Sequence, residues 1–218
     1  MISNLRERIP LEEFDYQALT GALDDYARPR DKITTLLNRG IIIRVKKGLY
    51  IFGSGLRKRP YSREILANLI YGPSCVSREY ALAYHGLIPE QVETITSVTS
   101  KRNKTFTTPL GVFDYRALPP AGFPFGIIRI ELADGSAFLL AGSEKALADK
   151  LYCEHGLSLT SAGNCLDYLT ISLRIDMEAL RTMDADLLDQ LARNYRSRRV
   201  KLLADCVRRL AGKDSGNE

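Results

Sequence analysis

The stretch ARPRDKITTLLNRGIIIRVKKGLYIF, residues 27–52, contains three structural signals in succession. Pro29 suits the first turn of a helix, where its missing N–H costs nothing, and apolar residues follow at helical spacing until Gly40. Side chains then alternate from residue 41 to 45, and an aromatic-rich run returns after a Lys-Lys-Gly turn. The pattern predicts a short amphipathic helix followed by a β-hairpin with a basic tip.

A helix followed by such a hairpin is typical of a winged helix-turn-helix, and residues 2–9 and a helix capped by Asp15 would supply its supporting helices. With the apolar stripe turned inward, the outer face presents side chains that suit phosphates and base edges. The predicted DNA-binding residues are Arg30, Lys32, Thr34, Thr35, Asn38, Lys46 and Lys47. Each feature alone is better explained by a solvated helix or a soluble hairpin, and only the order and spacing of the features favour DNA binding.

The positive charge of the chain is concentrated near this stretch. Residues 1–60 contain 12 Lys and Arg against 7 Asp and Glu, whereas residues 61–218 contain 19 of each, so the net charge of +5 belongs to the first segment. Its position favours a polyanionic partner there. No apolar run approaches the ~20 residues of a membrane span, and the N-terminus lacks the apolar centre of a signal peptide, so we expect a cytoplasmic protein without a membrane partner.

Cofactor and enzyme motifs are missing from the sequence. Four cysteines, Cys75, Cys153, Cys165 and Cys206, are widely scattered with no C-x-x-C pair, which predicts reduced thiols and no metal site or other cofactor. There is no Walker loop, G-x-S-x-G, H-E-x-x-H or compact acidic cluster. An enzyme acting on nucleotides or nucleic acid is therefore the weakest of the alternatives.

The segment GSGLRKRPY, residues 53–61, predicts a linker between a DNA-binding domain at 1–52 and a second domain at 62–218. In the second domain Ser62, Ser77 and Ser143 are expected to cap helices, and strands between 92 and 140 to form a small sheet. Periodic Leu and Ile predict helices up to residue 211, followed by a frayed tail. The predicted fold class is α+β: a winged helix-turn-helix, then a mixed domain with a small, mainly antiparallel sheet and a C-terminal helical part.

Three further groups of basic residues would either contact DNA or a partner or simply keep the surface solvated. They lie in the linker, in a turn between two predicted strands and on the last helix. The residues are Arg57, Lys58, Arg59, Lys101, Arg102, Lys104, Arg196, Arg198, Arg199 and Lys201.

Four motifs, in this order, resemble the AbiEi family, the antitoxins of type IV (abortive-infection) toxin–antitoxin systems. They are LLNRGIIIRVKKGLYIF at 36–52, SREYALAYHGL at 77–87, TSVTSKRNKTFTTPLGVFDY at 96–115 and SEKALADKLY at 143–152. The first motif suits many winged-helix proteins. The other three, behind a winged helix, are considerably more specific.

The resemblance implies a transcriptional repressor that binds double-stranded DNA at inverted repeats in its own operon promoter. It also implies an antitoxin that counters a nucleotidyltransferase-like toxin without needing to contact it. It adds Arg28 and Arg44 to the DNA-binding residues and implies no catalytic residue. The alternatives are a solitary winged-helix regulator and a module that binds a partner protein through its winged helix.

Overall fold

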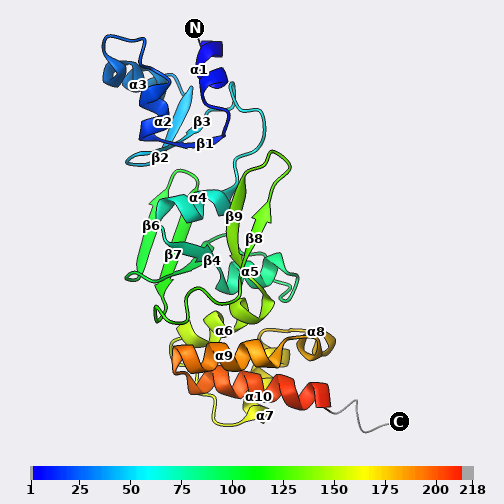
Figure 1. Ribbon diagram of the computed structural model, residues 1–218. Coiled ribbons are helices and arrows are strands. Elements are labelled where there is room, and N and C mark those ends of the chain that lie inside the picture. The colour runs from blue at the N-terminus through cyan, green and yellow to red at the C-terminus, as the bar shows by residue number, and fades with distance from the viewer. Residues whose placement is uncertain (1, 213–218) are drawn as a thin grey trace.

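The N-terminal part is a three-stranded antiparallel sheet with three helices. Its elements are α1 (Ile2–Arg8), β1 (Glu13–Asp15), α2 (Tyr16–Gly21), α3 (Pro29–Asn38), β2 (Ile42–Lys46) and β3 (Leu49–Phe52), and the sheet order is β1-β3-β2. Figure 1 presents the computed structural model, which describes residues 2–212. Most of the tail that the sequence predicts to be frayed, residues 213–218, lies outside the described residues.

Local signals place the helices of this part. The Asp15 carboxylate accepts a hydrogen bond of 2.8 Å from the Ala18 N–H and so caps α2, as predicted. The helix stops at Gly21, earlier than its apolar pattern suggests, because a turn then carries Leu23 into the core. Helix α3 begins at Pro29, and Gly40 follows its end with a φ of +64°.

The β2–β3 hairpin is covered on both faces. Tyr50 and Phe52 belong to the core formed with α2 and α3, whereas Leu49 and Ile51 belong to the core of the rest of the chain. All residues of β3, the central strand of the sheet, are buried because one core covers each face. The hairpin therefore joins the two parts of the molecule and is not a free wing.

A mixed six-stranded sheet forms the middle of the molecule. Its region contains α4 (Arg63–Ile70), β4 (Ser74–Val76), α5 (Arg78–Tyr84), β5 (Ile95–Thr99), β6 (Lys104–Thr108), β7 (Gly111–Ala117), β8 (Ile127–Glu131) and β9 (Ala137–Ala141). The order is β6-β7-β5-β4-β9-β8, with β5–β7 and β4–β9 parallel and the other pairs antiparallel. Strand β4 is absent from the sequence prediction because three residues are too few to show a period.

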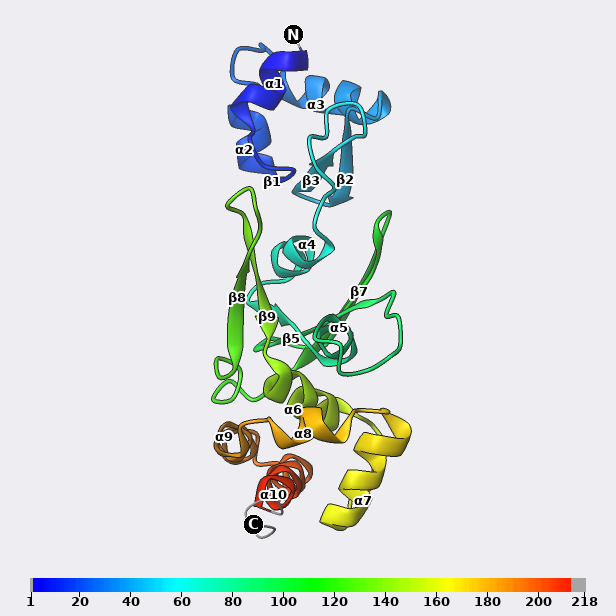
Figure 2. The same cartoon turned by 90° about the vertical axis from the view of Figure 1, so that its right-hand side faces the viewer.

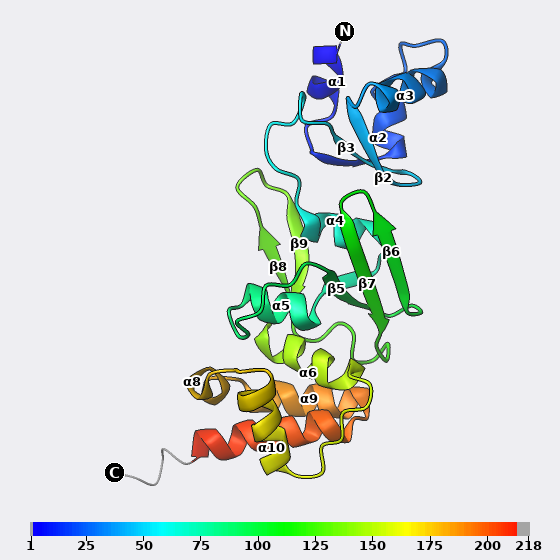
Figure 3. The ribbon, with the colours of Figure 1, turned by 180° about the vertical axis from the view of Figure 1, so that it is seen from behind.

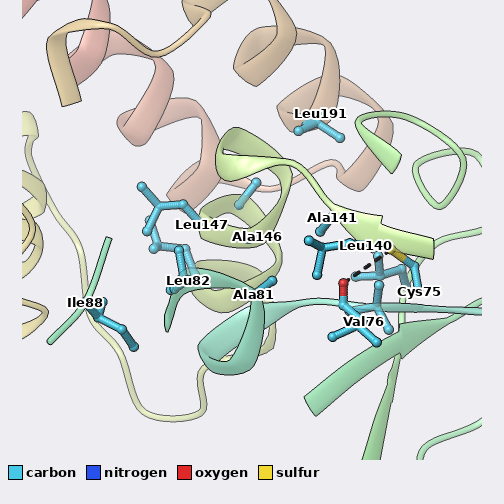
Figure 4. Packing of buried hydrophobic residues seen from close by; sticks show 14 of the residues in the cluster. Cys75, Val76, Ala81, Leu82, Ile88, Leu140, Ala141, Ala146, Leu147 and Leu191 are labelled. Carbon is cyan, nitrogen blue, oxygen red and sulfur yellow. Dashed lines mark hydrogen bonds between the residues drawn. The ribbon is translucent and has the colours of Figure 1, made fainter. Parts of the chain in front are cut away.

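Helices cover both faces of this sheet. In Figure 2, α4 lies on the side facing the N-terminal part, and α5 and α6 (Ser143–Cys153) lie on the other side. Figure 4 shows buried residues of β4, α5, β9 and α6 meeting in one cluster, with Leu191 of the C-terminal helices beyond them. The sheet and helices thus share a continuous core.

The C-terminal helices complete the α+β fold that the sequence predicts. They are α7 (Ala162–Asp167), a π-helical turn η1 (Tyr168–Ser172), α8 (Met177–Arg181), α9 (Ala185–Tyr195) and α10 (Arg198–Gly212). Helices α9 and α10 lie side by side at the end of the molecule farthest from α3 (Figures 1 and 3). None of the helices within residues 2–212 is long and apolar enough to cross a membrane.

Two of the three predicted serine caps, Ser62 and Ser77, are N-cap residues, and Ser143 is corrected. Ser62 caps α4, its hydroxyl accepting from the Ile65 N–H at 3.1 Å. Gly142 is the cap residue of α6, and Ser143 is its first helical residue. Ser77 is the N-cap residue of α5, as predicted, but its hydroxyl makes no capping bond and donates instead to the buried carboxylate of Asp149, at 2.6 Å.

Hydrogen bonds and ion pairs fix the segment 53–61 to both parts of the molecule. Glu12 accepts hydrogen bonds from the backbone N–H groups of Lys58, at 2.9 Å, and Arg59, at 3.3 Å. The Arg59 guanidinium donates to Glu13 on β1, at 2.9 Å, and to Asp134 in the turn before β9. Arg59 therefore ties the N-terminal sheet to the β8–β9 hairpin.

Candidate nucleic-acid interface

Helix α3 presents a polar face to solvent because Ile33 and Leu36 anchor its opposite face in the core. The predicted residues Arg30, Thr34, Thr35 and Asn38 all lie on the exposed face. The Thr34 and Thr35 hydroxyls donate to carbonyl oxygens one turn earlier, at 3.2 and 3.0 Å. Their oxygens remain able to accept hydrogen bonds, so the face offers cationic donors together with neutral polar groups.

The start of α3 borders a hollow of about 400 Å³, which Tyr16 and Thr20 of α2 also line. Arg28 and Arg30 line it too, and the Arg28 side chain is 85% exposed. The free backbone N–H groups of a helix start favour an anion. Asp31, a residue absent from the sequence-based set, also lines the hollow, with its carboxylate 4.0 Å from Arg28. Asp31 reduces the positive charge there.

Two other carboxylates, Asp24 and Asp25 in the turn before α3, share one arginine as their ion-pair partner. Arg8 of α1 donates to Asp24 at 2.6 Å and pairs with Asp25 as well. Lys32, farther along α3, holds its ammonium 4.7 Å from the centre of the Tyr26 ring. The repulsion that Asp24 and Asp25 would exert on a phosphate is therefore weakened by Arg8.

The hairpin places its three predicted cations differently. Arg44 is exposed, with its guanidinium carbon 5.8 Å from the centre of the Tyr50 ring, and Lys47 is exposed at the tip, where Gly48 has a φ of +86°. Lys46, in contrast, donates to the carbonyl oxygen of Ile70 at the end of α4. The hairpin packs on α4 and directs the Lys46 side chain toward the second part, so Lys46 and Lys47 lie in different surroundings.

Lys46 belongs to a cluster that no sequence pattern indicates. Lys101 and Lys104 place their ammonium groups 5.4 and 5.7 Å from the centre of the Tyr71 ring. Lys46 and Lys104 lie 5.7 and 4.8 Å from the Phe106 ring. Burial, with the charges of Lys104 and Lys101, lowers the pKa of Lys46. Three cations from separate segments thus meet over two aromatic rings at the junction of the two parts.

The other basic residues named from the sequence lie in different surroundings. Arg57 packs 5.1 Å from the Tyr61 ring, Lys58 and Arg102 are exposed, and Arg59 is held by Glu13 and Asp134. The Arg59 guanidinium thus already has two carboxylate partners, unlike the charged groups of Lys58 and Arg102 within residues 2–212.

The C-terminal basic residues are remote from α3. Arg196, Arg198, Arg199 and Lys201 lie at the opposite end of the molecule, around the start of α10 (Figure 3). Lys201 pairs with Asp189 and Asp205, both at 2.9 Å. These residues therefore do not extend the surface of α3, and Lys201 is engaged by carboxylates.

All four cysteines are free thiols, and burial raises the pKa of Cys75 and Cys153. No group of three or more His, Cys, Asp or Glu side chains within residues 2–212 is arranged to hold a metal ion. No model of a known protein family matches the chain, and no curated protein matches it.

Proposed function

We propose that the N-terminal part binds double-stranded DNA through α3 and that the protein represses transcription of its own operon in the cytoplasm. The proposal rests mainly on the basic and polar face of α3, which is exposed to solvent. The opposite, apolar face of α3 packs on the N-terminal sheet. The order of elements, three helices with a β-strand after the first and a β-hairpin after the third, is the one expected of a winged helix-turn-helix. The concentration of net charge in residues 1–60 supports the same function.

The residues of this surface divide into two roles. Thr34, Thr35 and Asn38 lie where a helix in the major groove meets base edges, and an asparagine amide can pair with adenine through two hydrogen bonds. Arg28 and Arg30 border the hollow at the helix start, where a phosphate would also meet free backbone N–H groups.

We further propose that the protein is the antitoxin of a type IV system, with a nucleotidyltransferase-like toxin as its functional partner. The support is the motif resemblance together with one contact between two of the motifs. Ser77, from the motif at 77–87, donates to Asp149, from the motif at 143–152. Co-expression of the chain with the product of the adjacent gene tests this role, and a neighbour that is not toxic, or that stays toxic in its presence, contradicts it.

Binding to a duplex from the upstream region of its own gene tests the repressor function. At about 150 mM salt, where non-specific binding is weak, the wild type should prefer this duplex to an unrelated one. Asn38→Ala should remove about 1–3 kcal/mol of that preference, whereas Arg30→Ala should weaken binding to both duplexes. Fluorescence anisotropy measures both effects.

The matched control is Arg129→Ala, which removes an exposed arginine on β8, far from α3. It should leave binding to both duplexes unchanged. A wild-type protein that binds the two duplexes equally would contradict the repressor function.

A second comparison separates the two lysines of the hairpin tip. Lys47→Ala should weaken DNA binding and reduce its salt dependence by about one phosphate contact. Lys46→Ala should change DNA affinity by less than about twofold, since its ammonium is directed away from the tip, and should instead lower the thermal midpoint. Equal losses of DNA affinity in the two variants would contradict the position of Lys46.

A further inference from the structure

A basic pocket of about 510 Å³ lies where β7 ends, beside the end of α6 and the turn between α9 and α10. We call it the arginine pocket, and its lining includes Arg116, Arg196, Arg198, Arg199, Asn103 and Tyr152. Figures 1 and 3 place these elements at the end of the molecule opposite α3. A duplex held by α3 therefore does not account for this concentration of charge.

The charges of the arginine pocket are largely unbalanced. Within residues 2–212, neither Arg196 nor Arg198 has a carboxylate in ion-pair range. Arg199 is bonded by backbone carbonyls alone, and only Arg116 has a carboxylate partner, Asp114 at 3.2 Å. Residues 61–218 contain equal numbers of basic and acidic residues, so this excess is local. Such a concave positive site concentrates anions.

Some other exposed arginines of the second part are paired, whereas Arg102, Arg193 and Arg209 are exposed without a carboxylate partner among residues 2–212 but lie outside the arginine pocket. Arg129 pairs with Glu131, Arg174 with Glu90, and Arg208 with Asp186 and Asp189. Paired arginines of this kind are explained by surface ion pairs alone. Arg196 and Arg198 have no carboxylate partner among residues 2–212, and they share one pocket with Arg116 and Arg199.

Backbone carbonyls hold the Arg199 guanidinium, and the turn between α9 and α10 positions Arg196 and Arg198. Arg199 donates to the carbonyl oxygens of Leu151, at 3.1 Å, and Glu154 at the end of α6. Arg196 ends α9 with a φ of +50°, a left-handed conformation that is unfavourable for a residue with a Cβ. Strained positions of this kind recur at ligand sites. The turn thereby brings Arg196 and Arg198 to the same pocket from either side of Ser197.

Neutral groups complete the site. The Asn103 side-chain oxygen accepts from the Ala117 N–H at 2.7 Å, which leaves its amide N–H groups able to donate. The start of α10 also lines the pocket, and free backbone N–H groups at a helix start favour anions. Tyr152 adds a half-buried aromatic ring that packs on Tyr195.

We propose that the arginine pocket binds a diphosphate or triphosphate group, as carried by inorganic pyrophosphate or a nucleoside triphosphate. Guanidinium groups match phosphate oxygens through paired hydrogen bonds, and several of them together suit a ligand with more than one negative charge. A volume of about 510 Å³ is typical of a small-molecule site. Binding at this pocket is independent of the proposed contact between α3 and DNA.

Calorimetric titration of the full chain with inorganic pyrophosphate, ATP and adenosine tests the proposal. Pyrophosphate and ATP should each bind at a single saturable site, and adenosine should not. Tighter binding of ATP than of pyrophosphate would identify a nucleotide as the ligand, whereas equal binding would identify the phosphate group alone. Both results support the proposal, and the absence of saturable binding of either anion below about 1 mM would overturn it.

Variants locate the binding. Arg196→Gln with Arg198→Gln should weaken the affinity about a hundredfold, and Arg116→Gln on β7 about tenfold, since each change removes charge-assisted hydrogen bonds. The matched control is Arg193→Gln with Arg209→Gln, which removes the same charge from exposed positions on α9 and α10 outside the pocket. Thermal unfolding verifies that each variant is folded. Equal weakening in the control would overturn the site, because it would reveal non-specific charge attraction.

Discussion

Asp149→Ala is expected to lower the free energy of unfolding by about 3–5 kcal/mol, because it leaves a buried ammonium without its counter-ion. The side chains of Lys145 and Asp149, one turn apart on α6, are both 0% exposed and lie 3.4 Å apart. The Tyr195 hydroxyl bonds to both of them, and the Ser77 hydroxyl donates to Asp149 at 2.6 Å. One carboxylate therefore connects α6 to α9 and to the start of α5.

Urea unfolding, extrapolated to zero denaturant, measures this loss. Asp205→Ala is the matched control, since Asp205 also pairs with a lysine one turn away, Lys201, but on the exposed face of α10. That control should cost less than about 1 kcal/mol. Lys145→Met with Asp149→Leu should recover part of the loss because neither charge remains. Equal losses for Asp149→Ala and Asp205→Ala would contradict the buried network.

Arg59→Ala is expected to lower the free energy of unfolding by about 2–3 kcal/mol. This is less than the loss expected for a fully buried ion pair, because the Arg59 side chain is 22% exposed. The Glu13 side chain is only 1% exposed and would keep one partner among its present contacts, the Ser62 N–H at 2.6 Å. The loss should be accompanied by faster proteolysis within residues 53–61, because Arg59 fixes that segment to both parts of the molecule. Urea unfolding and limited proteolysis measure the two effects.

The effect of this substitution should also depend on pH. Hydrogen bonds from Ser136 and then Arg59 lower the pKa of Asp134 to about 2. A lowered carboxyl pKa stabilises the fold above the ordinary value of about 4, and this contribution is lost as the pH falls toward 2. Asp134 contributes to the difference in free energy of unfolding between wild type and Arg59→Ala. This contribution should therefore shrink as the pH falls from about 4 to about 2.

Arg57→Ala is the matched control for Arg59→Ala, because Arg57 lies in the same segment and packs on the Tyr61 ring but has no ion pair with a carboxylate among residues 2–212. Arg57→Ala should lower the free energy of unfolding by less than about 1 kcal/mol and leave the rate of proteolysis within residues 53–61 unchanged. If Arg57→Ala and Arg59→Ala opened the segment equally, the contacts of Arg59 with Glu13 and Asp134 would not be what fixes it.

Local features of the sequence predicted much of the fold. Pro29 and Gly40 bound α3, and Asp15 and Ser62 cap their helices. These features are predictable because caps, turns and helical periods depend on neighbours a few residues away in the chain. The α+β class and the exposed face of α3 follow from the same local information.

The partners of the charged side chains were decided by the tertiary structure alone. Lys46 and Lys47 are adjacent in the sequence, yet of the two only Lys46 donates a hydrogen bond to a carbonyl oxygen of α4. Lys145 and Asp149 are buried because α5, α9 and α10 all pack around α6, which the period of α6 does not reveal. The arginine pocket joins Arg116 to the distant turn at Arg196. A sequence pattern determines which faces of an element are apolar or charged, whereas the element packed against that face determines whether a charge meets solvent, a carboxylate or an open pocket.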